Sequence, residues 1–388
     1  WIYACAASDL ETVQALIEVC CTPSAKVSAL DINATEQDGY SGFMFACAKS
    51  NESIVDATLK ACKNEAFNLK APLDLNLESS GLTAPLIALV TGEGEEIVTN
   101  ILNSCTTDVK NIAPLNLNHT DSEGRSLFVF AEMYPGTEMI QGLLDACGAG
   151  SDLNLAEPLD INAQGVKQRS GLMRACKKGN IDNVNIILSA CVEGAKIAPL
   201  DLNLLDHEEK TAFMLACHHK HPDVIDALLG AVSPDSKLNL AAPLDLNLAC
   251  DTGPPIVYCA LEGLDDLLEA ILDACSTDND KIASLDLNAL DEDDWTALMF
   301  AAAMGNSDVV NLILGATAAD SKVNIAQPLD INIVDKENGN SALLLACMKG
   351  YDTIVDAILK VCQSDAKITP LDLDLRNENE QTASQLAE

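Results

Sequence analysis

Apolar and polar positions along this chain follow a pattern that repeats every 41 to 44 residues. Each repeat is marked by a short string of an Asp or Asn residue, an aliphatic residue and a second Asp or Asn residue. The nine strings lie at 31–33, 74–76, 116–118, 160–162, 201–203, 245–247, 286–288, 330–332 and 372–374. Because the strings run through the whole sequence without a linker, we predict a single repeat array over residues 1–388.

The segment 286–316 illustrates what one repeat is expected to build. After a polar loop, Thr296 suits the N-cap of a short first helix, since its hydroxyl can accept a free backbone N–H. Gly305 suits the end of that helix. Valine, isoleucine and leucine then recur at helical spacing over 309–314 and predict a second helix. Two short helices cannot bury their apolar sides alone, so we expect successive pairs to stack on one another.

This repeat resembles a known family. The segment DLNALDEDDWTALMFAAAMGNSDVVNLIL is similar to the ankyrin repeat, with its pattern D-V-N-A-x-D-x-x-G-x-T-P/A-L-H-x-A-A-x-x-G-H-x-x-V-V-x-x-L-L. The matching residues are Asp286, Asn288, Ala289, Asp291, Thr296, Ala297, Leu298, Ala301, Ala302, Gly305, Val309, Val310 and Leu314. The similarity extends in weaker form across the chain. It implies an all-α, ankyrin-type helix-turn-helix solenoid with protruding loops, and a role in binding other proteins.

The repeats depart from the family in length and at one polar position. They are roughly ten residues longer than the family's repeat of about 33. The additional segment, such as AKIAPLDLN at 195–203, follows the second helix. Its recurrent aliphatic residues predict ordered, enlarged inter-repeat loops, and alternation over 243–248 predicts short extended stretches that pair as a small ladder. Met214 and Met299 stand at the family's histidine position, where we expect apolar packing to replace the polar link.

Both ends of the sequence fall inside a repeat. Trp1 aligns with Leu298, and residues 382–388 align with 296–302. Because repeat arrays need polar terminal repeats for solubility, we expect this sequence to be a piece of a longer chain.

The charge balance narrows the class of partner. The chain has 59 acidic and 23 basic residues and a formal net charge of −36. Such a surface repels nucleic-acid phosphates and anionic lipid headgroups, so we expect no nucleic-acid and no membrane partner, and favour a basic protein. The longest apolar candidate segment, 82–90, is too short to cross a bilayer.

Most of the fifteen cysteines recur at two fixed positions in the repeats, and Cys21 and Cys250 fall outside this pattern. Seven lie near the end of the second helix, and five share one position on the first helix. Equivalent residues of stacked helices are roughly 10 Å apart, farther than a disulfide can bridge. We therefore interpret them as small buried apolar residues, which favours a reducing, cytoplasmic or otherwise intracellular location.

We find no motif for catalysis or for cofactor binding, and predict a protein that is not an enzyme, with no catalytic residues, cofactor or metal. The run 217–221 holds one cysteine and three histidines, but Cys217 lies in a core column and His221 aligns with the family's Gly-His turn. The repeated Asp and Asn strings could suggest calcium, yet bracing of their own turns is the simpler explanation.

Positions just before the first helices are the candidates for partner contact. This column varies between repeats, whereas the core columns do not, and it contains Tyr40, Leu82, Arg125, Arg169, Lys210 and Trp295. Variable loop positions that carry Tyr, Trp and Arg are typical of recognition surfaces. Random variation of a surface position is the other interpretation. The acidic run 291–294 beside Trp295 is equally typical of a solvated loop.

A basic island is the second candidate. Five cationic residues fall within twelve positions of one repeat: Lys167, Arg169, Arg174, Lys177 and Lys178. They would hold an acidic segment of a partner or of a neighbouring copy, or else reduce self-repulsion. The sequence thus predicts a protein-binding scaffold. The alternatives are a structural subunit of a large assembly, or an array that regulates an enzyme outside these residues.

Overall fold

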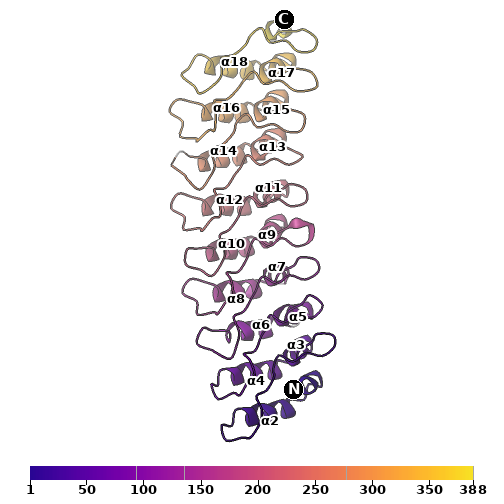
Figure 1. Cartoon of the computed structure of the whole chain (residues 1–388). Coiled ribbons are helices and arrows are strands. Elements are labelled where there is room, and N and C mark those ends of the chain that lie inside the picture. Colours follow the sequence, from indigo (N-terminus) through magenta and orange to yellow (C-terminus); the bar gives the residue numbers. More distant parts are fainter. Residues whose placement is uncertain (93, 135, 277, 388) are drawn as a thin grey trace. The chain divides into compact units, whose positions relative to one another are not determined.

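A computed structural model describes residues 1–92, 94–134, 136–276 and 278–387. In this part of the chain, short first helices alternate with second helices, as predicted (Figure 1). The first helices are α1 (Ile2–Ala6), α3 (Gly42–Ala48), α5 (Ala84–Val90), α7 (Leu127–Met133), α9 (Gly171–Lys178), α11 (Ala212–His218), α13 (Pro255–Glu262), α15 (Ala297–Met304), α17 (Ala342–Lys349) and α19 (Ala383–Leu386). The second helices are α2 (Leu10–Cys20), α4 (Glu52–Cys62), α6 (Glu95–Leu102), α8 (Glu138–Ala146), α10 (Ile181–Ala190), α12 (Pro222–Ala231), α14 (Asp265–Ala274), α16 (Ser307–Ala316) and α18 (Asp352–Val361).

The described chain forms two compact units. One comprises residues 1–175, 180–200 and 237–239, and the other comprises 176–179, 201–236 and 240–388. In the first unit, α1, α3, α5 and α7 pack in succession, as do α2, α4, α6, α8 and α10. In the second unit, α13, α15, α17 and α19 pack in succession beside the row of α12, α14, α16 and α18. The predicted all-α, helix-turn-helix solenoid is confirmed.

Polar caps fix where the first helices begin. The hydroxyl of Thr296 accepts the backbone N–H of Met299 at 3.2 Å, and the Met299 sulfur accepts the N–H of Thr296 at 3.4 Å. The pair Thr211 and Met214 repeats this arrangement at 3.2 and 3.5 Å. Both methionines are buried, as expected for apolar packing, and their thioether sulfur in addition keeps a weak polar link to the cap.

Gly305 ends α15 with φ +75°, a left-handed conformation that glycine adopts without strain. The turn leads into α16, where Val309, Val310 and Ile313 are fully buried. Burying a side chain of this kind contributes roughly 1.5–3 kcal/mol. Because the second helices present such residues in each unit, stacking supplies the core that no single helix pair has.

The cysteines belong to this core. All fifteen are free thiols in the structure, and all except Cys21 and Cys362 are buried. Burial raises the pKa of Cys105 and of Cys275 to about 12. The prediction of small buried apolar residues is confirmed for these thiols.

The enlarged loops are ordered and pair with one another. In the second unit, Leu285 bridges Ile325 and Leu329 bridges Ile368 in parallel pairing. The backbone N–H of Asn324 also donates to the carbonyl of Cys275 at 2.6 Å, so the loop caps the end of the preceding second helix. The expected ladder is present as isolated bridges, and no continuous strand forms within the described ranges.

The Asp-x-Asn strings form a second set of links. The side chain of Asn288 donates to the carbonyl of Pro328 at 2.9 Å and accepts the N–H of Asp330 at 2.7 Å. Within one string, Asp286 accepts the N–H of Asn288 at 2.9 Å. The Asp residues brace their own turns, as predicted, and the Asn residues in addition join one repeat to the next.

Among the helices that the structure describes, none combines the length and the apolar character needed to cross a membrane.

Candidate partner-binding surface

An acidic side chain holds several of the loops before the first helices in shape. The carboxylate of Asp291 accepts the backbone N–H groups of Asp293 at 3.0 Å and of Trp295 at 2.8 Å. Asp206 accepts the N–H groups of Glu208 and Lys210 in the same way. Such turns fix the backbone of the residue that precedes the helix cap. Trp295 and Lys210 are therefore presented at defined positions.

Two aromatic pairs lie where loop and helix meet. The rings of Trp295 and Phe300 are 4.8 Å apart between centroids, and those of Tyr40 and Phe45 are 5.1 Å apart. All four side chains are partly exposed. Each pair joins the residue before the cap to the fourth residue of the helix, which is the arrangement of a hydrophobic staple.

Tyr40 and Trp295 are therefore under structural demand, because the side chain of each packs on the fourth residue of the helix. Phe45 and Phe300 were not among the contact residues predicted from the sequence. The signal was available, since an aromatic residue stands four places after the cap in both repeats.

Arg125 continues the same column with a cation in place of an aromatic ring. Its guanidinium lies 4.8 Å from the centroid of Phe130 and forms ion pairs with Asp121 at 2.5 Å and Glu123 at 3.0 Å. The side-chain and backbone N–H donors of Arg125 lower the pKa of Asp121 against the opposing effect of burial. Arg125 is thus held within its own loop, which limits its reach towards a partner.

The predicted basic island is partly internal. Arg169 is only 7% exposed, Glu132 is 2% exposed, and Arg174 is partly buried between them and Arg125. Burial and the two neighbouring arginines lower the pKa of Arg174, whereas the charge of Glu132 opposes that effect. The side chain of Arg169 therefore lies in the protein interior. Lys167, in the short 3-10 helix Val166–Gln168, is exposed.

Gly165 leaves room for the side chains of two arginines. A Cβ atom at this residue would lie 3.2 Å from Cγ of Arg125 and 3.3 Å from Nη2 of Arg174. The same Nη2 donates to the carbonyl of Val166 at 3.2 Å. The structure therefore brings Arg125, Arg169 and Arg174 together around Glu132, which the sequence spacing alone did not indicate.

Lys210 belongs to the second unit, together with His207, His218, His219 and His221. The ammonium of Lys210 lies 3.6 Å from Glu208 and 3.7 Å from Asp251. Near it, the ring of His218 stacks on Tyr258 at 4.4 Å, and burial followed by the charge of Lys210 lowers its pKa.

The remaining histidine of interest, His221, lies with Nε2 3.2 Å from the carbonyl of Lys177. A Cβ at Gly179 would press on its ring at 2.5 Å, so the Gly-His pair is a packing contact in this unit. Among the described residues, no group of three or more His, Cys, Asp or Glu side chains is arranged to hold a metal ion.

A family model described as ankyrin repeats (3 copies) matches residues 127–242 and 172–326, which together span just over half of the chain. No curated protein matches the sequence.

Proposed function

The chain belongs to the ankyrin-repeat proteins, and on that premise we propose that it is a non-catalytic scaffold that binds a basic protein partner. Ankyrin repeats are protein-interaction modules. The finer proposal concerns which surface is used and what kind of protein it binds. The observation that carries it is the pair of partly exposed aromatic clusters, Tyr40 with Phe45 and Trp295 with Phe300.

These clusters suit binding because they are both apolar and fixed in place. Tyr and Trp are enriched among the residues that dominate interface energies, since they bury a large area and lose little conformational freedom. The Asp291 turn and the contact with Phe300 already restrict Trp295 before any partner arrives. A side chain that is already restricted loses less conformational entropy when it binds a partner.

The charge of the chain supports a basic partner. With a net charge of −36, the protein attracts cationic proteins and repels anionic ones, which speeds encounter with the former. Lys167 and the accessible side of Arg174 are a local exception to this acidic surface. We propose that they bind an acidic side chain of the same partner. The free thiols support an intracellular, reducing location.

The test is a quantitative pull-down from cells that express the full-length protein. We expect Trp295→Leu, which keeps an apolar side chain for Phe300 but removes the indole, to reduce recovery of a specific basic partner about tenfold or more. Tyr40→Leu and Lys167→Glu are the companion variants. The matched controls are Met304→Ala, an exposed residue at the other end of α15, and Lys322→Glu, in an inter-repeat loop.

Loss of one partner in the three loop variants and its retention in both controls would support the proposal. Unchanged partners in all five variants would contradict it and favour a structural subunit that is fixed through its inter-repeat loops. Recovery of an associated enzyme that depends on residues beyond this chain would favour the regulatory alternative.

A further inference from the structure

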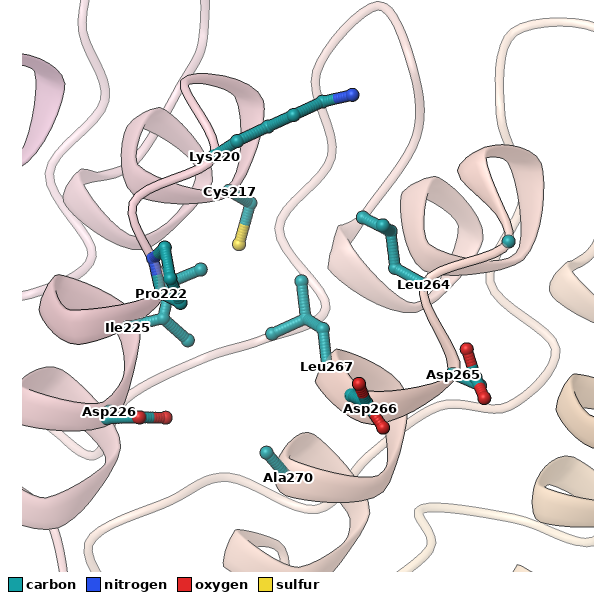
Figure 2. A pocket seen from close by; sticks show the side chains of 11 residues that line it. Cys217, Lys220, Pro222, Ile225, Asp226, Leu264, Asp265, Asp266, Leu267 and Ala270 are labelled. Atoms are coloured by element: carbon teal, nitrogen blue, oxygen red, sulfur yellow. The ribbon is translucent and has the colours of Figure 1, made fainter.

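A groove lies between the second helices α12 and α14, away from the loops that precede the first helices (Figure 2). Its volume is about 520 Å³, within the range of roughly 300–1,000 Å³ that is usual for ligand sites. The Cys217 sulfur, Ile225, Leu267 and Ala270 line its centre in Figure 2. Burial raises the pKa of Cys217 well above its usual value, so this thiol forms part of an apolar floor.

The groove exists because α14 departs from the other second helices of this unit at one position. Three residues after the N-cap, α12, α16 and α18 carry Val224, Val309 and Ile354, each at most 1% exposed. The equivalent residue of α14 is Leu267, which is only partly buried and points into the groove. The N-cap residue of α14, Leu264, makes no capping hydrogen bond. Two leucines thus leave apolar surface uncovered.

Carboxylates surround this apolar surface. Asp226 lies on the α12 side, and Asp265 and Asp266 lie on the α14 side. None of the three forms an ion pair with a cation in the described part of the chain. Lys220, the one cation of the lining, extends away from the centre, and its ammonium lies 3.5 Å from Glu262. The rim is therefore available to positive charge from outside.

Two smaller hollows adjoin the groove along α14 and α16. One, of about 310 Å³, shares Asp265 with the groove and adds Glu269 and Asp308. The other, of about 210 Å³, shares Glu269 with its neighbour and adds Asp273. This track of neighbouring hollows over α12, α14 and α16 suits an extended chain better than a compact small molecule.

We infer that this track binds an extended basic segment of a partner protein, with one large apolar side chain in the groove and flanking Lys or Arg residues beside the carboxylates. The apolar floor selects the central side chain through burial, and the acidic rim selects its neighbours through charge. The inference rests on the proposed role in protein binding, but it uses a surface separate from the loops, so either can fail alone.

The test uses synthetic peptides as probes of the full chain. A fluorescein-labelled peptide Gly-Arg-Lys-Ser-Leu-Ser-Lys-Arg-Gly is titrated by fluorescence anisotropy, beside one with Ala in place of Leu and one with Glu in place of every Arg and Lys. We expect the Leu peptide to bind about tenfold more tightly than the Ala peptide, as burial of a leucine predicts. The Glu peptide should not bind.

Two variants locate the site. Ala270→Arg fills the groove and should abolish the preference for Leu over Ala, whereas Ala227→Arg, at the same position of α12 and outside the lining, should keep it. Asp266→Lys should weaken the Leu peptide severalfold, whereas Asp223→Lys, at the same position of α12, should leave the affinity nearly unchanged. Thermal unfolding of each variant checks that it is folded.

Equal binding of the Leu and Ala peptides, absence of binding at millimolar peptide, or a Leu preference that survives in Ala270→Arg would each overturn the inference. Trp295→Leu separates the two proposals. If the groove is an independent site, this loop variant binds the Leu peptide as the unmodified protein does, even where the loop surface has lost its own partner.

Discussion

At the scale of single residues, the cysteines show how one repeated position serves the core. Cys62, Cys105 and Cys147 occupy the same place near the ends of successive second helices, and burial raises the pKa of each to about 12. A thiol with such a pKa is almost entirely protonated at neutral pH and is a poor nucleophile. These residues therefore act by packing.

This assignment predicts the reactivity of the thiols. In the folded protein at pH 8, we expect only the partly exposed Cys21 and Cys362 to react within minutes with a thiol reagent such as Ellman's. The buried thiols should react only after unfolding in guanidinium, because they are neither ionised nor accessible. Mass spectrometry of the labelled peptides identifies the sites. Rapid labelling of Cys105 or Cys147 in the native protein would contradict the burial described for them.

At the scale of elements, the helix pairs are joined by a chain of Asn side chains as well as by apolar contact. Asn288 bridges two repeats through the Pro328 carbonyl and the Asp330 N–H. Asn247 does the same through Ser284 and Asp286. These bonds explain why each repeat keeps an Asx residue at this place, and why the long inter-repeat loops stay ordered.

Removal of one such link should destabilise the second unit measurably. We expect Asn288→Ala to lower the free energy of unfolding by about 1–3 kcal/mol, because the Asp330 N–H and the Pro328 carbonyl both lose a partner. Urea unfolding followed by circular dichroism measures the change. Asn311→Ala, an exposed position on α16 in the same repeat, is the control and should cause little loss. Equal stability of the two variants would mean that the Asn link contributes nothing.

At the scale of the whole molecule, charge is the dominant property. A net charge of −36 on 388 residues means that carboxylates repel one another across the surface, while the ion pairs in the described part of the chain are mostly exposed and contribute little. The repeat period continues unchanged across the border between the two units. A single array over residues 1–388 therefore stays our prediction for the organisation of the chain.

Self-repulsion predicts how stability depends on salt. Between about 0.01 M and 0.15 M ionic strength, the screening length falls from about 30 Å to about 8 Å, so repulsion between surface carboxylates weakens. We expect the unfolding temperature to rise over this range, as calorimetry in NaCl solutions would measure. A fall in the unfolding temperature would show instead that attractive ion pairs dominate the electrostatics.

The sequence by itself determined the repeat, the two helices within it and the buried columns. It could do so because helix caps such as Thr296 and stripes such as Val309 to Leu314 depend on neighbours close in the chain. It also indicated the loop residues Tyr40 and Trp295, though not that each packs on a ring five positions later.

Only the tertiary structure decided what meets across repeats. It placed Arg169 and Glu132 in the interior and left Leu267 uncovered beside Ile225. The physical reason is that burial and hydrogen bonding at these places depend on residues some 40 positions away. A local sequence pattern does not determine how closely the surfaces of two neighbouring repeats approach each other.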